Sequence, residues 1–151
     1  EMDDFSAKPG VPNAYGLVGN SANAIEPEKR MLSSMSPTIV ETPNGELSLV
    51  LGSPGGSTII TTVAQIIMNV IDFNMNIEDA VETPRFHHQW LPDIIQFESI
   101  GFSPETIQAL ESRGHAIKYR DTFGEANCIQ VEDGLIYGSA DSRRNASALG
   151  Y

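Results

Sequence analysis

The sequence contains a single cysteine, Cys128, so no disulfide bond can form within its 151 residues. The cysteine count therefore does not identify the compartment in which the protein works. Cys128 lies in residues 126–131, where apolar and polar residues alternate as they do in a strand with one buried face. We interpret it as a buried strand thiol rather than as a nucleophile.

Basic residues are also scarce. The chain has 9 lysines and arginines against 20 aspartates and glutamates, which gives a formal net charge of -11. Nucleic acids and anionic membrane surfaces bind basic faces, so this charge argues against both as partners. The longest apolar stretch, residues 59–70, is interrupted by threonine, glutamine and asparagine and is too short to cross a bilayer.

Only three histidines are present, and two of them, His87 and His88, are adjacent. Neighbouring side chains on an extended segment point to opposite sides, so this pair would not easily chelate one metal ion. No third ligand has convincing spacing, and we expect neither a metal site nor a cofactor. We interpret the surrounding residues 85–93 as structural, with their aromatic side chains packed in the core, and His115 as the start of a strand.

Residues 1–37 are rich in glycine, proline, asparagine and serine and show little periodicity. Their aromatic and apolar side chains favour a long loop pinned over another part of the protein rather than a solvated tail. Residues 38–151 form the α/β portion of what we interpret as a single domain. Within it the patterns predict helices over 57–72, 76–83 and 103–113, and strands over 38–41, 47–51, 94–97, 116–119, 126–132 and 135–138. This order is typical of an α+β fold with helices packed on a largely antiparallel sheet.

A glycine-rich turn, Gly52-Ser53-Pro54-Gly55-Gly56-Ser57, joins a predicted strand to a predicted helix. Paired glycines let the backbone approach a ligand closely, and a helix N-terminus adds free N–H groups and a partial positive charge. Such a turn can hold an anion, or an oxygen that becomes anionic during a reaction. A tight turn without any ligand is the commoner use of this pattern, and the spacing alone does not exclude it.

Two further segments could bind charged groups. Residues 33–36 place three hydroxyl groups before a strand, where they could hydrogen-bond a carboxylate, and Glu1, Asp3 and Asp4 could bind an ammonium group or a metal ion. Taken alone, the first segment is better explained as an ordinary polar loop and the second as a solvated acidic terminus. Together with the glycine turn, however, they supply the parts needed to hold an α-amino acid acyl group.

These segments occur in an order that resembles the small subunit of bacterial gamma-glutamyltranspeptidases (glutathione hydrolases). The resemblance rests on Glu1-Met2-Asp3-Asp4-Phe5-Ser6, Tyr15-Gly16-Leu17-Val18-Gly19, Arg30 through Pro37, Gly52 through Ser57 and Arg85 through Asp93, and it covers nearly the whole chain. It implies part of an N-terminal nucleophile hydrolase fold, a four-layer αββα sandwich built from a large and a small subunit. In that family a precursor cleaves itself, and a new N-terminal threonine attacks the γ-glutamyl amide.

The resemblance also implies roles for particular residues. Glu1 and Asp4 match the positions that hold the substrate α-amino group, and Ser33 and Ser34 match the pair that binds its α-carboxylate. Gly55 and Gly56 match the pair whose backbone N–H groups form the oxyanion hole, and so take part in catalysis. Expected partners are γ-glutamyl compounds such as glutathione, the large subunit and the N-terminal part of the small subunit.

The sequence also departs from the family pattern. The Thr-Thr-His nucleophile segment is absent, as is the large-subunit arginine that pairs with the substrate carboxylate, and the C-terminal Asp-Pro-Arg of many members is here Asp141-Ser142-Arg143. We therefore expect a piece of an enzyme that is inactive and prone to aggregation alone. The resemblance implies that this enzyme is periplasmic or secreted. The alternatives are a non-catalytic amino-acid-binding or interaction module, or a related acylase with another acyl substrate. The serine pair favours γ-glutamyl compounds.

Overall fold

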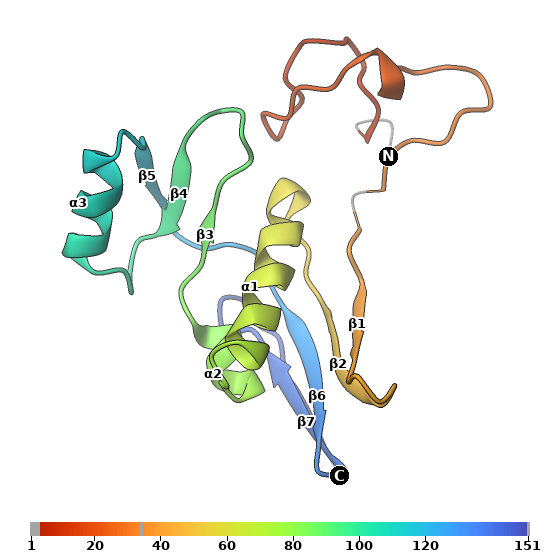
Figure 1. Cartoon of the computed structure of the whole chain (residues 1–151). Coiled ribbons are helices and arrows are strands. Elements are labelled where there is room, and N and C mark those ends of the chain that lie inside the picture. The colour runs from red at the N-terminus through yellow and green to blue at the C-terminus, as the bar shows by residue number, and fades with distance from the viewer. Residues whose placement is uncertain (1–3, 34, 151) are drawn as a thin grey trace.

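The computed structural model describes residues 4–33 and 35–150, and it contains two β-sheets with helices packed beside them (Figure 1). The larger sheet has the strand order β1-β2-β6-β7, and each neighbouring pair is antiparallel. The turns predicted at Asn44-Gly45 and Asp133-Gly134 join neighbouring strands, as expected. The four strands are β1 (Thr38–Glu41), β2 (Leu47–Gly52), β6 (Asn127–Glu132) and β7 (Leu135–Ala140).

Two helices, α1 (Ile59–Ile71) and α2 (Ile77–Glu82), cover one face of this sheet. The buried positions of α1 recur at helical spacing. Packing of its early β-branched residues against the core compensates for their low helix propensity. Asn76 caps α2 through a 2.8 Å hydrogen bond that its side chain accepts from the Asp79 amide. The core between helices and sheet consists of Leu49, Leu51, Ile59, Val63, Ile66, Ile77, Ala80, Val81, Ala126 and Cys128.

The second sheet corrects the expectation of a single, largely antiparallel sheet. It has the order β3-β4-β5, formed by β3 (Phe86–His87), β4 (Ile95–Glu98) and β5 (Ile117–Arg120). β4 and β5 pair in parallel, because the chain crosses over between them through α3 (Pro104–Ser112). The two-residue strand β3 was missed because its pairing with β4 is too short to leave a periodic pattern.

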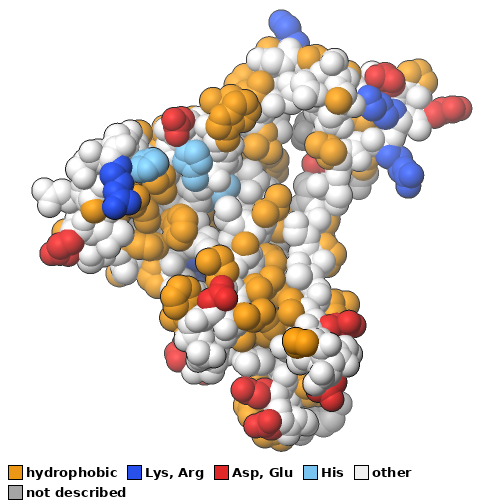
Figure 2. All heavy atoms as spheres, viewed as in Figure 1, with side chains coloured by type: hydrophobic (Ala, Val, Ile, Leu, Met, Phe, Trp, Pro, Cys, Tyr) orange, Lys and Arg blue, Asp and Glu red, His pale blue; other side chains and the backbone are white. Residues whose placement is uncertain are grey.

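The larger sheet is covered by helices on one face only. The register aligns Ile39, Val50 and Ile129 on the opposite face, and Ile136 extends this row on β7. Ile39 is 68% exposed and Ile136 is 75% exposed. On the helix side, hydrophobic side chains also gather over α1 and α2 in Figure 2. Both apolar surfaces are unusual for a chain that folds and works alone.

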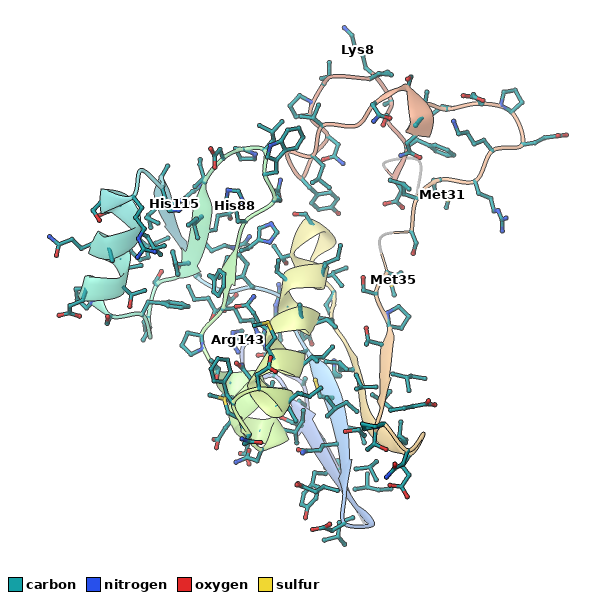
Figure 3. All side chains as sticks on the ribbon, in the orientation of Figure 1. Lys8, Met31, Met35, His88, His115 and Arg143 are labelled. Atoms are coloured by element: carbon teal, nitrogen blue, oxygen red, sulfur yellow. The ribbon has the colours of Figure 1, made fainter. Side chains whose placement is uncertain are left out.

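A buried ionic cluster joins the two sheets. Arg85 donates hydrogen bonds of 2.7 Å to Asp141 Oδ2 and to the carbonyl of Phe123. Arg143, which lies near the centre of the molecule in Figure 3, donates to both carboxylate oxygens of Glu98 at 2.6 and 2.7 Å. It also reaches Asp141 Oδ1 at 3.1 Å. The cluster ties together β3, β4 and the segment after β7, so Asp141-Ser142-Arg143 has a structural role.

The two carboxylates of this cluster are held in their charged form. Burial alone would raise the pKa of Glu98, but hydrogen bonds from Arg143 and from the amides of Arg85 and Phe123 lower it below its usual value. Burial likewise opposes ionisation of Asp141, and its pKa is lowered by the Ala126 amide and by Arg85. Each carboxylate is thus more acidic in the folded protein than in an unfolded chain.

The histidine-containing segment is only partly what the sequence suggested. His87 is buried and His88 is exposed, so the two rings do point to opposite sides. The aromatic side chains do not pack in the core as expected, since Trp90 is 74% exposed and Phe86 is 45% exposed. The buried residues of this segment are instead the polar ones, Arg85 and His87. Both terminal nitrogens of Arg85 and both ring nitrogens of His87 have hydrogen-bond partners, whereas Arg85 Nε has none among the described residues.

The N-terminal loop (residues 4–33) lies at the end of the molecule where α1 begins (Figure 1). It contains the short 3-10 helix η2 (Ser21–Asn23) and is braced by a 2.9 Å hydrogen bond from the Ser6 amide to the Asn23 carbonyl. The division of the chain at residues 37 and 38 stays a prediction. Within the described ranges, no helix combines the length and apolar character needed to cross a lipid bilayer.

Candidate functional site

The glycine turn links the end of β2 to α1, as the sequence predicted. It leads into a single 3-10 turn, η3 (Gly56–Thr58), which continues directly into α1. Gly55 has φ 148° and Gly56 has φ 58°, and both values lie in the range that residues with a side chain rarely adopt. Among the described residues, neither amide has a hydrogen-bond acceptor. Their N–H groups are therefore free to bind an external oxygen at a helix N-terminus.

The turn is held in place by the segment before β6. Ser53 Oγ accepts a 2.9 Å hydrogen bond from the Glu125 amide and donates a 2.7 Å bond to the Pro54 carbonyl. Gly124 packs so closely on this serine that an added Cβ would lie 2.5 Å from Ser53 Oγ. Thr58 completes the turn by donating its hydroxyl hydrogen to the Gly55 carbonyl at 2.9 Å. These contacts fix the direction of the two glycine amides.

The N-terminal loop passes over the same glycines. A Cβ added to Gly56 would lie 2.5 Å from Cε1 of Tyr15, so the tyrosine ring occupies the space beside this residue. Between loop and helix lies a cavity of about 540 Å³. Asp4, Ser33, Gly56 and Ser57 all line it. Three residues singled out from the sequence, which lie up to 52 positions apart, thus face one cavity.

Asp4 and Ser33 approach the cavity from loop segments that the backbone holds in position. The carbonyl of Asp4 accepts a 2.7 Å hydrogen bond from Asn23 Nδ2, which fixes its backbone. Ser33 Oγ accepts a 3.1 Å bond from the Met35 amide and is exposed. Gly55 adjoins the cavity through Gly56, while Glu1 and Ser34 lie outside the described residues. The site thus offers a carboxylate, a hydroxyl and free amides to one ligand.

This combination suits a zwitterionic acyl group. The carboxylate of Asp4 can pair with an ammonium group, and the hydroxyl of Ser33 can donate to a carboxylate. The amides of the turn can stabilise an oxyanion that forms on a carbonyl between them. No group of three or more metal-binding side chains is found within residues 4–33 and 35–150.

A threonine–histidine pair lies outside the cavity lining, and its geometry does not suit nucleophilic attack. Thr61 Oγ1 lies 2.8 Å from His87 Nδ1 and 3.1 Å from the Thr58 carbonyl. His87 is only 2% exposed, and neither residue lines the cavity with Asp4. We therefore assign the pair a structural role. The sequence carried no signal for it, because the two residues are 26 positions apart in different elements.

Comparison with known proteins agrees with this arrangement. A sequence model of the gamma-glutamyltranspeptidase family matches residues 1–151. The chain is 56% identical to the glutathione hydrolase proenzyme of Escherichia coli (strain K12), over 95% of this chain and 24% of that protein. It spans about a quarter of the length of the curated relatives that it matches first.

Solved structures show the same similarity. A mutant of the gamma-glutamyltranspeptidase of Helicobacter pylori superposes with a TM-score of 0.91 at 56% identity, covering 95% of this chain and 79% of that one. The enzyme of Pseudomonas nitroreducens in complex with L-DON superposes with a TM-score of 0.92 at 44% identity, covering 100% and 79%. These superpositions confirm the α+β fold class and its place among N-terminal nucleophile hydrolases.

Proposed function

We propose that this chain, which belongs to the gamma-glutamyltranspeptidase family, forms part of a γ-glutamyl-transferring enzyme. That enzyme transfers the γ-glutamyl group of glutathione and related amides to water or to an amine. The observation that carries this proposal is the shared cavity of Asp4, Ser33 and Gly56. Its three kinds of polar group match the three polar ends of a γ-glutamyl amide.

In the proposed complex, Asp4 binds the α-ammonium group and Ser33 donates a hydrogen bond to the α-carboxylate. Glu1 and Ser34 are proposed to assist them. The γ-carbonyl oxygen then faces the amides of Gly55 and Gly56. When a nucleophile attacks the γ-carbon, the negative charge that develops on this oxygen is stabilised by both N–H groups.

The proposed nucleophile is the N-terminal threonine that membership of the family implies, on a segment outside these 151 residues. Its hydroxyl oxygen forms a bond to the γ-carbon, and the amine of the substrate leaves with a proton. Water or an acceptor amine then attacks the resulting ester, which releases the γ-glutamyl product and regenerates the threonine. Autoprocessing of a precursor would expose this threonine.

The test uses the full-length processed enzyme and compares three anilides. The γ-glutamyl anilide has both α-groups, the glutaryl anilide lacks the α-amino group, and the 4-aminobutyryl anilide lacks the α-carboxylate. We expect Asp4→Asn to lower kcat/KM for the γ-glutamyl anilide by roughly 10- to 100-fold, as the loss of a hydrogen bond to a charged group does. It should scarcely affect the glutaryl anilide.

Ser33→Ala provides the complementary measurement, because its penalty should vanish with the 4-aminobutyryl anilide. Asp72→Asn serves as the matched control, since Asp72 ends α1 far from the cavity lining. Equal penalties of Asp4→Asn on all three anilides would contradict its assigned role. If the full-length wild-type protein turns over none of the three anilides, a non-catalytic binding module or an acylase with another substrate would be the better interpretation.

The large subunit and the rest of the small subunit are the proposed partners of this chain. The uncovered apolar face of the larger sheet supports this, because the four-layer sandwich requires a second sheet against it. The exposed apolar residues of α1, among them Ile60, Met68 and Ile71, offer further surface for the same partners. A periplasmic or secreted location is proposed from family membership alone, and cell fractionation would test it.

A further inference from the structure

A chain of side-chain hydrogen bonds runs from α1 to the N-terminal loop. His87 Nδ1 lies 2.8 Å from Thr61 Oγ1 on α1, and His87 Nε2 lies 2.8 Å from Gln89 Oε1. Gln89 Nε2 donates a 2.9 Å hydrogen bond to the carbonyl of Tyr15. In Figure 1 the loop that follows β3 reaches toward the N-terminal loop. The helix that carries the oxyanion turn is thus connected to the loop that covers it.

The orientation of the glutamine amide is determined by its partners. Gln89 Nε2 faces two carbonyl oxygens, those of Tyr15 at 2.9 Å and Leu91 at 3.0 Å, and both can only accept. Gln89 Oε1 therefore faces His87, and His87 Nε2 must be the donor of that bond. A reversed amide would place Gln89 Oε1 against the carbonyl oxygens of Tyr15 and Leu91, which are also acceptors, so that orientation is strongly disfavoured.

The two ends of this chain of hydrogen bonds differ in how deeply they are buried. His87 is 2% exposed and packs beside Phe123, with ring centroids 6.1 Å apart. Tyr15, in contrast, is 53% exposed. Gly16, beside the Gln89 amide, has a φ of 76°, a backbone conformation that residues with a side chain rarely adopt. A rigid, buried residue therefore holds the side chain that in turn holds the loop.

The bond from Gln89 is also the loop's link to the body of the protein. Within the described part of the chain, the other hydrogen bonds of residues 8–19 stay inside the loop, such as Gly10 N to Gly19 O at 2.8 Å. The position of Tyr15 beside Gly56 therefore depends on packing and on this one hydrogen bond to the segment after β3.

We propose that Gln89, oriented by His87, is a positioning residue that keeps the Tyr15 segment closed over the oxyanion turn. It acts through Tyr15 and does not touch the acyl group. Closure limits the entry of water beside Gly56, while a single half-exposed hydrogen bond can break when substrate enters or product leaves. This inference rests on the proposed function of the Gly56 site.

The test compares Gln89→Leu with Gln65→Leu in the full-length processed enzyme. Gln65 is a matched control because its amide group also bonds backbone atoms at β3, donating to the Phe86 carbonyl at 2.8 Å, but it does not reach the loop. Hydrogen exchange of residues 11–18 is measured by mass spectrometry, together with kcat and KM for a γ-glutamyl anilide. Gln89→Glu is a second variant that keeps the acceptor for His87 and loses both donors.

We expect Gln89→Leu and Gln89→Glu to speed exchange in residues 11–18 by about three- to tenfold and to lower kcat/KM by a similar factor. Gln65→Leu should leave exchange in these residues unchanged. If both Gln89 variants exchange and turn over like the wild type, the positioning role is wrong although the proposed function stands. If the wild-type enzyme does not act on γ-glutamyl compounds, the proposed function fails and the exchange data still test the anchor.

Discussion

Gly56 is subject to two separate constraints at the scale of a single residue. Its φ of 58° disfavours any side chain, and the Tyr15 ring already fills the place of a Cβ. The first constraint concerns backbone strain, which costs about 1–2 kcal/mol for a non-glycine residue in the left-handed region. The second concerns the closure of the loop over the site. Suitable variants can separate the two.

We expect Gly56→Ala in the full-length enzyme to lower kcat/KM for a γ-glutamyl anilide by at least about tenfold, because the methyl group displaces Tyr15 and shifts the oxyanion donor. Gly134→Ala is the control: Gly134 has a φ of 76°, but an added Cβ there meets nothing within 4 Å. It should lower the melting temperature without lowering activity. A fully active Gly56→Ala enzyme would show that the contact with Tyr15 is dispensable.

Only some of the site residues could be identified from the sequence. Asp4 and Ser33 could be selected for their chemistry, but their loop has no periodicity, so only the resemblance indicated that they meet Gly56. The structure brings them to one cavity, and their roles stay predictions. His87 and Gln89 were interpreted as structural, but their contacts with Thr61 and Tyr15 could not be predicted, because these partners are distant in the chain and give no local pattern.

At the scale of elements, turn and cap signals were more reliable than sheet topology. The boundaries of α2 and α3 follow Asn76 and Ser103, whose side chains accept hydrogen bonds from Asp79 and Thr106. The hairpins follow their Asn-Gly and Asp-Gly turns. The parallel pairing of β4 with β5 was not anticipated, because it depends on how α3 packs rather than on any local residue.

The uncovered face of the larger sheet leads to a prediction for β6. Ile129 lies on this face opposite Val50 and is partly exposed. If a second sheet packs there, Ile129→Glu places an unpaired charge in an apolar interface, at a cost of several kcal/mol. We expect this variant of the full-length precursor to give little soluble, processed heterodimer in size-exclusion chromatography, whereas Ile129→Leu should assemble normally. Normal assembly of the glutamate variant would contradict the proposed interface.

For the whole molecule, the ionic cluster predicts how stability depends on pH. Glu98 and Asp141 have pKa values below those of an unfolded chain, so the unfolded state takes up protons first as the pH falls. Their contribution is fully present above about pH 4–5, where both carboxylates would be ionised in either state, and is lost as the pH falls through the lower folded values. Glu98 and Asp141 should therefore leave the melting temperature of the assembled enzyme nearly constant from pH 7 to 5. Below pH 4 the melting temperature should be lower.

Asp141→Asn is expected to remove part of this acid dependence and to destabilise the enzyme already at pH 7. Breaking one partner of a buried ion pair typically costs about 3–5 kcal/mol, because the remaining charges lose their compensation. Asp93→Asn is the control, since its contact with His88 is at the surface. Melting temperatures that fall in parallel with acid for wild type and Asp141→Asn would contradict the assignment.

The burial of Cys128 has a practical consequence for following the loop in solution. Burial raises the pKa of its thiol to about 11, so only about one molecule in 10,000 carries a thiolate at pH 7. Thiol-directed dyes react with the thiolate and need access, and this side chain offers neither. A cysteine introduced at the exposed Ala14, next to Tyr15, would thus be the site in this chain that accepts a fluorophore. Opening and closing of the loop could then be timed by fluorescence without removing the native cysteine.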